Sequence, residues 1–206
     1  MERYILNFVM TQIPNLDIAF MAVFGLLIGS FLNVVIYRLP KMMERQWAAE
    51  CTELSGNPQE SGDAFNLVVP RSACPACGHK IKWYENVPVI SYVVLRGRCS
   101  ACQAPIGLRY PAVELACAAL FSYCAWRWGA SMTTLVWCAF SAAILALAAI
   151  DWDTTLLPDD INQPLLWLGL IAAAVQWTPV GLSTALWGAV AGYLSLWSVY
   201  WAFKLV

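Results

Sequence analysis

Two long blocks without a charged side chain constrain this chain more than any other feature of its sequence. Residues 128–150 contain no Asp, Glu, Lys or Arg, and neither do residues 161–203. Between the blocks lie four carboxylates within ten residues, at Asp151, Asp153, Asp159 and Asp160. A charge inside the hydrocarbon of a bilayer costs at least about 2.5–3.5 kcal/mol. The blocks therefore predict membrane helices, and we expect the acidic stretch to lie at a membrane–water boundary.

The overall composition agrees with this interpretation. Hydrophobic residues make up 60% of the 206 positions and charged residues only 12%, whereas soluble proteins average roughly 45–50% apolar and 25% charged residues. The net charge of −1 provides no general attraction to nucleic acid, so no nucleic-acid partner is expected. The first apolar run has an acid, Asp17, at its start and lacks a basic n-region, so no cleavable signal peptide is evident. The composition predicts an integral membrane protein in contact with the lipid bilayer.

We expect an all-α polytopic membrane protein with about five transmembrane segments. A span needs about 20 apolar residues, and shorter runs indicate tilted or partly re-entrant segments. The first span is expected to end at the basic stop Arg38-Leu-Pro-Lys41. The expected domains are 1–37 (N-terminal lead and first transmembrane helix), 38–111 (a polar insert) and 112–206 (a transmembrane bundle). The predicted spans are 18–37, 115–126, 132–150, 165–177 and 182–203.

Charge placement predicts how these segments are oriented. Nine of the twelve Lys and Arg residues lie in the insert 38–111, and basic loops remain in the cytoplasm. We therefore expect the insert, the acidic stretch and Lys204 on the inner face and the N-terminus outside. Within the first span, Gly25 and Gly29 form a G-x-x-x-G pattern that permits close helix packing. Asn33 in the same span is either a helix–helix hydrogen-bonding residue, which is the favoured interpretation, or a substrate contact.

Four cysteines in the insert have the spacing of a metal site. They form two C-x-x-C pairs separated by 21 residues, at Cys74, Cys77, Cys99 and Cys102. Such pairs supply tetrahedral Zn²⁺ with four thiolates, which leaves no open coordination position and makes the metal structural. A redox dithiol and a chance pairing of the cysteines are the alternatives, although disulfides are disfavoured in the cytoplasm. His79 is expected to be a spare or supporting residue rather than a ligand. The insert is thus predicted to be a small zinc-ribbon-like unit.

The acidic stretch is the candidate catalytic site. Two carboxylates that share a proton can hydrolyse a peptide bond, one activating water and the other polarising the carbonyl. Asp151, at the end of a predicted helix, is placed to be one of them, and Asp153 points elsewhere on the helix. Asp159 and Asp160 equally suit a cap for the next helix. The simpler alternative is a solvated polar loop between two spans.

Four motifs in order resemble the bifunctional type IV prepilin peptidase family. They are GLLIGSFLNVVIYRLP at 25–40, the CPAC…CSAC tetracysteine insert, RYPAVELA at 109–116 and IDWDTTLLPDD at 150–160. The resemblance implies an aspartic protease of the bacterial inner membrane. Such enzymes remove the leader from type IV prepilins and type II secretion pseudopilins after a Gly, and then methylate the new N-terminal residue from S-adenosylmethionine. It also implies that Asp151 is the first catalytic aspartate and that the four cysteines are zinc ligands.

The chain departs from the resembled family at the second catalytic aspartate. That residue belongs to a GxGD motif just after the last predicted span, and residues 1–206 contain neither this motif nor any acid after Asp160. We therefore expect a fragment that cannot run the two-aspartate reaction alone, unless Asp159 replaces the missing acid. Glu114 is either an acid in the first turn of a helix or a residue of the substrate or methyl-donor site. No motif locates the methyl-donor site.

Two other functions follow from the residues alone. A non-catalytic membrane scaffold, with the zinc unit docking partner proteins, would explain the missing second acid. A transporter with Asp151 and Glu114 as ion sites is disfavoured, because no acid lies in the middle of a predicted span. A downstream reading frame that contains GxGD would favour the enzyme over the scaffold.

Overall fold

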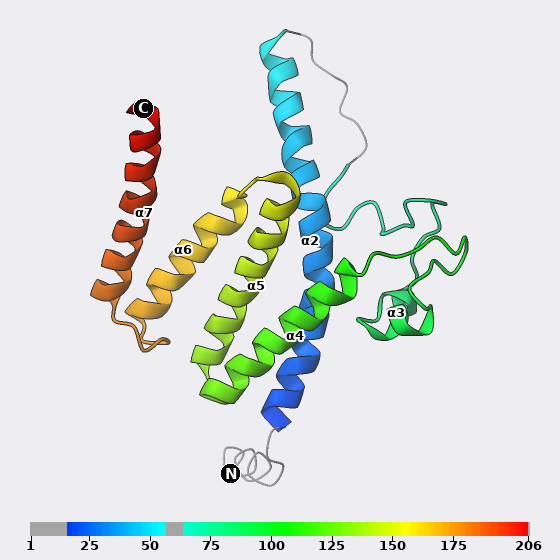
Figure 1. The fold of residues 1–206 in the computed structure, drawn as a ribbon, viewed down its shortest axis with the longest axis horizontal. Coiled ribbons are helices and arrows are strands. Elements are labelled where there is room, and N and C mark those ends of the chain that lie inside the picture. Colours follow the sequence, from blue (N-terminus) through cyan, green and yellow to red (C-terminus); the bar gives the residue numbers. More distant parts are fainter. Residues whose placement is uncertain (1–15, 57–63, 206) are drawn as a thin grey trace.

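The computed structural model describes residues 16–56 and 64–205, which are helical and contain no β-strand (Figure 1). The amphipathic lead expected at 1–15 lies outside these residues. Between α2 and α4 the insert holds two short helices, η1 and α3. The elements are α2 (Leu16–Leu54), η1 (Trp83–Asn86), α3 (Ile90–Val94), α4 (Arg109–Trp128), α5 (Met132–Thr154), α6 (Asp159–Ala174) and α7 (Leu182–Leu205).

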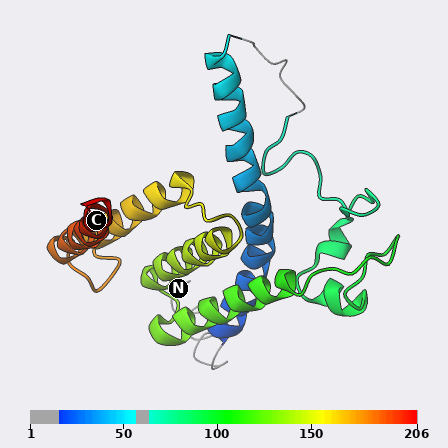
Figure 2. The ribbon, with the colours of Figure 1, turned by 45° about the horizontal axis from the view of Figure 1, so that its top comes forward.

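The core lies where α2, α4 and α5 pack together (Figures 1 and 2). Cys117 and Phe121 of α4 and Ala146 and Ile150 of α5 are all at most 2% exposed. The insert lies on one side of α2 and α4, and α6 and α7 lie on the other. The α5 core position Ile150 directly precedes Asp151, so the end of α5 is anchored in the best-packed part of the molecule.

Two glycines allow α2 and α4 to cross at close range. A Cβ atom on Gly25 would lie 2.7 Å from Cα of Ala118, and one on Gly29 would lie 2.6 Å from Cα of Glu114. Any larger residue would collide with the α4 backbone. The predicted role of the G-x-x-x-G pattern in close packing is confirmed.

Asn33 joins the same two helices by a hydrogen bond. Its side-chain amide donates to the backbone carbonyl of Tyr110, one residue into α4, at 3.0 Å. The favoured interpretation of Asn33, a helix–helix contact, is therefore confirmed.

The first predicted span ends at residues 38–41, but the helix that contains it does not. α2 continues through Pro40 to Leu54. Arg38 is only 6% exposed, and its guanidinium donates to the carbonyls of Asn66 at 2.8 Å and Pro70 at 2.6 Å. Because backbone carbonyls of the insert accept hydrogen bonds from Arg38, its buried guanidinium is stabilised. The positive charge therefore does not force the helix to end. The apolar part of α2 ends here, and a solvent-exposed polar part follows.

Five long helices coincide with the five predicted spans, but they differ in apolar length. Three are long and apolar enough to cross a bilayer by themselves: α2, α5 and α7. The helix α4 carries Arg109, Glu114 and Arg127, and α6 is only 16 residues long. These two shorter or more polar helices, α4 and α6, precede and follow α5 in the sequence. The chain is an α-helical membrane protein.

Candidate functional site

The four predicted metal-binding cysteines lie together in the insert. The Sγ atoms of Cys74, Cys77, Cys99 and Cys102 are all within 4.8 Å of one another, and those of Cys74 and Cys102 are 3.8 Å apart. A tetrahedral site with Zn–S bonds of about 2.3 Å places its sulfur atoms about 3.8 Å apart. The cluster therefore has the donor set and dimensions of a four-thiolate metal site.

Each C-x-x-C pair forms a knuckle with the same backbone pattern. In the first, Cys74 N–H donates to His79 O at 2.9 Å, and Gly78 N–H donates to Cys74 O at 2.9 Å. In the second, Cys99 N–H donates to Ala104 O at 2.9 Å, and Gln103 N–H donates to Cys99 O at 3.0 Å. The residue after each knuckle has a positive φ, 71° at Gly78 and 60° at Gln103. The repeated turn presents two thiols from each knuckle to one point.

The surroundings of the thiols suit a cation. The backbone N–H of Ala76 is the main cause that lowers the pKa of Cys74 to about 7, and a lower pKa favours the metal-binding thiolate. The pKa of Cys77 is raised to about 12: the N–H of His79 is the largest influence and lowers it, but the neighbouring sulfur atoms outweigh that effect. The crowded sulfur atoms disfavour a further negative charge at Cys77. A bound cation would offset this repulsion and stabilise the thiolate form.

His79 does not contribute an atom to the cluster. Its Nε2 lies 3.3 Å from Oε2 of Glu85 and 3.3 Å from Oγ of Ser100. Glu85 also accepts a hydrogen bond from the backbone N–H of Lys82 at 2.8 Å, and this N–H is the main cause that lowers the pKa of Glu85 to about 2. His79 therefore connects the first knuckle to the second, in agreement with the supporting role expected for it.

Asp151 lies in the last turn of α5 and is exposed. Its backbone carbonyl accepts the N–H of Thr155 at 2.8 Å, and Thr155 ends the helix in the left-handed conformation at φ 54°. The carboxylate thus projects from a helix end whose preceding residue, Ile150, is fully buried. This arrangement gives a water-accessible acid with a fixed backbone, as the candidate catalytic role requires.

Arg109 is a site residue that the sequence did not single out. From the first turn of α4, its guanidinium donates to the carboxylate of Asp153, and NH2 donates to Ala149 O at 3.2 Å. These two acceptors lie two residues on either side of Asp151. The carboxylate of Asp153 is therefore occupied by an ion pair with Arg109. Within the sequence, only its place in the RYPAVELA motif sets Arg109 apart from other basic residues.

The two aspartates after Pro158 do not cap α6 with their side chains. Asp159 and Asp160 occupy the first turn of the helix, and Pro158 is the N-cap residue and makes no side-chain cap. The alternative interpretation, in which one of these aspartates caps α6, is therefore wrong. Negative charge in a first turn is nevertheless favourable, because it faces the positive end of the helix dipole. These acids have a structural explanation that does not involve catalysis.

Glu114 is neither in the first turn of its helix nor exposed. It is the sixth residue of α4, 8% exposed, and its carboxylate accepts the backbone N–H of Val89 at 2.7 Å. Val89 precedes α3 and has a positive φ of 58°. The expectation of a first-turn acid is wrong, because α4 begins at Arg109. Glu114 instead fastens the insert to the membrane helices at a strained position.

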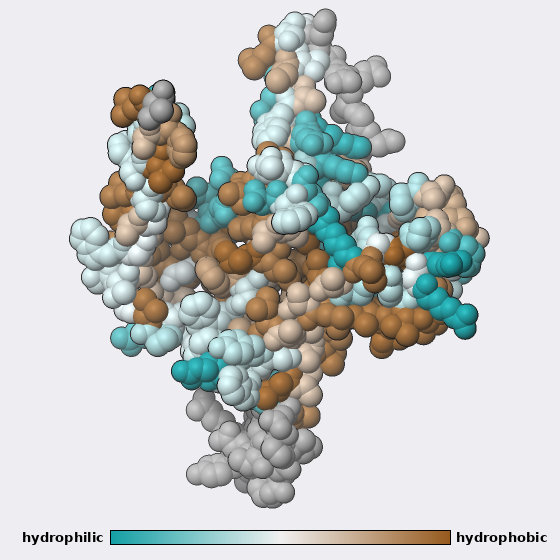
Figure 3. All heavy atoms as spheres, in the orientation of Figure 1, coloured by the Kyte–Doolittle hydropathy of each residue, from teal (hydrophilic) through white to brown (hydrophobic). Residues whose placement is uncertain are grey.

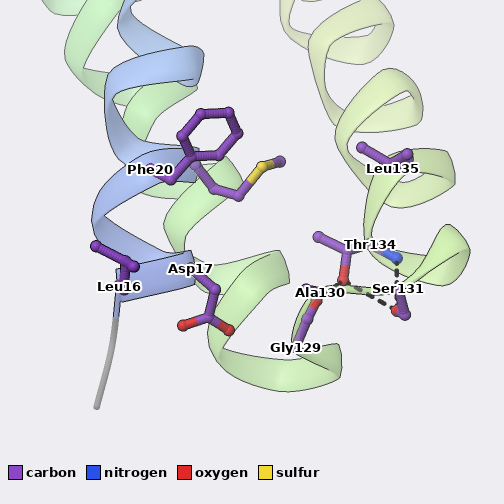
Figure 4. Close-up of a pocket in the computed structure, with 9 residues that line it drawn as sticks. Leu16, Asp17, Phe20, Gly129, Ala130, Ser131, Thr134 and Leu135 are labelled. Atoms are coloured by element: carbon purple, nitrogen blue, oxygen red, sulfur yellow. Dashed lines mark hydrogen bonds between the residues drawn. The ribbon is translucent and has the colours of Figure 1, made fainter. Parts of the chain in front are cut away.

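A groove of about 470 Å³ lies at the other end of α5 from Asp151 (Figure 4). Its walls come from the start of α2 and from the turn between α4 and α5. The polar groups near it serve the backbone: Asp17 accepts the N–H of Ile18 at 2.9 Å, and Ser131 accepts the N–H of Thr134 at 3.3 Å as the N-cap of α5. The groove brings no set of reactive groups together, so it is not the candidate catalytic site.

Two family models match the chain. The bacterial peptidase A24 N-terminal domain matches residues 23–128, and the type IV leader peptidase family matches residues 138–205. The first range contains the tetracysteine cluster and the second contains Asp151. Both candidate sites therefore lie within matched segments.

Several curated proteins are similar to the chain over most of its length. The prepilin leader peptidase/N-methyltransferases of Pseudomonas putida and Pseudomonas aeruginosa are each 54% identical, over 94% and 88% of this chain and 67% and 63% of their own. That of Aeromonas hydrophila is 48% identical over 94% of this chain and 67% of its own. The chain thus spans about two thirds of the length of these relatives. No solved structure matches it significantly.

Proposed function

This chain belongs to the type IV leader peptidase family, and from that premise we propose that its protein removes the leader peptide of type IV prepilins and type II secretion pseudopilins and N-methylates the new N-terminal residue. The observation that carries this proposal is the position of Asp151. It is exposed at the end of a membrane helix, while its neighbour Ile150 is fully buried. A water-accessible, rigidly held carboxylate at a membrane boundary is what leader hydrolysis requires.

The proposed cleavage needs a second carboxylate close to Asp151. One acid takes a proton from the attacking water while the other, protonated, polarises the scissile carbonyl. Asp153 is paired with Arg109, and Asp159 and Asp160 occupy the first turn of α6. We therefore propose that the partner acid lies outside residues 151–160.

We propose zinc as the ion of the tetracysteine cluster. Four thiolates at tetrahedral spacing favour Zn²⁺ and fill its coordination shell, so the ion would hold Cys74, Cys77, Cys99 and Cys102 together without touching substrate. S-adenosylmethionine is the proposed methyl donor, on the strength of the methyltransferase activity named for the relatives. No residue of the chain is assigned to that donor.

The proposed location is the bacterial inner membrane, with the insert in the cytoplasm. Nine basic residues in 38–111 support this orientation through the positive-inside rule. The apolar helix of a pilin precursor would lie in the bilayer, with its basic leader beside the acidic end of α5. Cys51 is an exposed thiol on the polar part of α2. It should react with a membrane-impermeant maleimide in inverted vesicles and not in intact spheroplasts.

Deletion of the native gene tests the function directly. Cells without it should accumulate pilin precursors that retain the leader, and the restored gene should yield mature pilin with a methylated N-terminus by mass spectrometry. Normal maturation in the deleted strain would contradict the proposal. A precursor that is bound by the protein but never processed would favour the non-catalytic scaffold instead.

A further inference from the structure

The insert exposes an apolar face on α3 that nothing in the described residues covers. Ile90, Val93 and Val94 are 62%, 67% and 73% exposed. Their spacing of three and four residues places them on one side of the helix. The opposite side faces the insert, where Tyr92 packs so closely on Gly97 that an added Cβ would lie 2.8 Å from the tyrosine hydroxyl. Exposed apolar faces of this kind mark interaction surfaces.

Aromatic and basic side chains flank this face. Trp83 is 79% exposed and Tyr84 is 50% exposed, and these two residue types are enriched at membrane–water interfaces. Lys82 and Arg96, which lie within eight residues of the face in sequence, are also exposed. Figure 3 shows hydrophobic side chains gathered along the α3 side of the insert, with strongly hydrophilic side chains beside them.

The charge of the insert favours an anionic partner. Residues 64–108 contain five basic residues and one acid, a net charge of +4. The single acid, Glu85, is turned toward His79 and its side chain is only 11% exposed. A bound Zn²⁺ with four thiolates would add −2, which still leaves the insert positive. An anionic surface would therefore meet no exposed carboxylate on this part of the chain.

The position of α3 next to the membrane helices indicates that the anionic partner is the surface of the lipid bilayer. The hydrogen bond from Val89 N–H to Glu114 at 2.7 Å fixes the start of α3 beside α4. Figures 1 and 2 show α3 beside the start of α4, on the side of α4 away from α5, whereas the polar end of α2 extends away from it. Glu114 directly precedes the predicted span 115–126, so an exposed apolar helix held beside it is placed where that span enters the bilayer.

We propose that the insert is a membrane-docking unit as well as a metal site. The α3 face enters the inner leaflet, and Lys82 and Arg96 contact anionic phospholipid headgroups. This inference goes beyond the proposed function. Its assignment to the inner leaflet rests on the proposed cytoplasmic location of the insert.

Photo-crosslinking distinguishes lipid from a protein partner. Benzoylphenylalanine replaces Val93 in the whole protein, reconstituted in phosphatidylethanolamine–phosphatidylglycerol vesicles, and adducts are identified by mass spectrometry. Leu54, which is 89% exposed at the polar end of α2, is the matched control position. We expect lipid adducts at position 93 at least tenfold above those at position 54. Equal yields, or adducts in native membranes to a protein instead of lipid, would overturn the proposal.

A second arm tests the headgroup contact. Replacing phosphatidylglycerol by phosphatidylcholine should lower the adduct yield at position 93 several-fold. The double variant Lys82→Gln, Arg96→Gln should lose this dependence on lipid charge while it keeps its metal content. A wild-type yield that is the same in both vesicles would refute the anionic contact.

Discussion

Arg109 in the first turn of α4 forms an ion pair with Asp153 in the last turn of α5, 44 positions away in the sequence. The same guanidinium donates to Ala149 O at 3.2 Å. Asp151 lies midway between these two acceptors. One arginine thus fixes the turn that carries the proposed catalytic carboxylate, and it also joins that turn to the start of the helix that follows the insert.

Arg109→Ala, made in the native gene, should slow leader cleavage more than it affects stability. The ion pair is partly exposed, with side chains 42% and 35% accessible, so its loss should cost at most about 1 kcal/mol. A carboxylate displaced by about 1 Å can lower the rate of the chemical step by up to about 100-fold. We expect kcat for cleavage to fall about tenfold or more, with little change in KM.

Methylation of a pilin peptide that lacks its leader is the internal control for Arg109, because no peptide bond has to be hydrolysed in that reaction. It should be unchanged in Arg109→Ala. The exchanged pair Arg109→Asp with Asp153→Arg should recover part of the cleavage rate. Equal losses of cleavage and methylation would show that Arg109 supports the whole fold and does not position Asp151.

Gly29→Ala should disrupt the crossing of α2 and α4. Its Cβ would lie 2.6 Å from the backbone of Glu114, and overpacking of this kind typically costs about 1–3 kcal/mol. Gly188→Ala on α7 is the matched control, since a Cβ there meets nothing within 4 Å. Thermal unfolding in detergent should show a lower midpoint for Gly29→Ala alone, and equal midpoints would contradict the described crossing.

Cys74→Ser should open the proposed zinc site. One lost thiolate breaks the closed shell, so zinc per chain should fall and the insert should become sensitive to proteolysis. Cys51→Ser removes a thiol that lies outside the cluster and should leave both properties unchanged. Metal analysis by plasma mass spectrometry measures the zinc, and full zinc occupancy in Cys74→Ser would refute its role as a ligand.

Glu114→Ala should release the insert from the membrane helices. The variant leaves the partly buried N–H of Val89 without its acceptor, which should cost about 1 kcal/mol, the lower end of the range for an unsatisfied buried donor. Glu114→Gln keeps an acceptor oxygen and should retain most of the contact. Hydrogen exchange at the amides of residues 89–94 should accelerate in the alanine variant only, and unchanged exchange there would contradict the role of Glu114.

The features that could be predicted from the sequence are those governed by local spacing or by the exclusion of charge from lipid. The charge-free blocks predicted α5 and α7, and the C-x-x-C pairs predicted the tetracysteine cluster. The glycine spacing at 25 and 29 predicted the close crossing of two helices. In each case the physical requirement acts over a few residues or on a whole segment, so no tertiary contact has to be known.

The features that were missed depend on contacts between distant segments. α2 passes through residues 38–41 because carbonyls of the insert satisfy Arg38, almost 30 residues away in the sequence. Glu114 of α4 binds the insert because the backbone N–H of Val89 approaches it. Arg109 contacts Ala149 and Asp153, at least 40 positions later in the sequence, and no local pattern predicts that contact. The hydrogen-bond partners of buried polar groups are set by the tertiary fold. The hydrophobic periodicity of the sequence does not indicate which residues those partners are.

The central claim is that the carboxylate of Asp151 performs leader cleavage at the inner membrane boundary. Its most direct test is prepilin processing in cells whose native gene carries Asp151→Asn, with Asp160→Asn in the first turn of α6 as the matched control. Both variants should accumulate in the membrane with normal zinc content. The account predicts unprocessed precursor with Asp151→Asn and mature pilin with Asp160→Asn; normal processing by Asp151→Asn would contradict it.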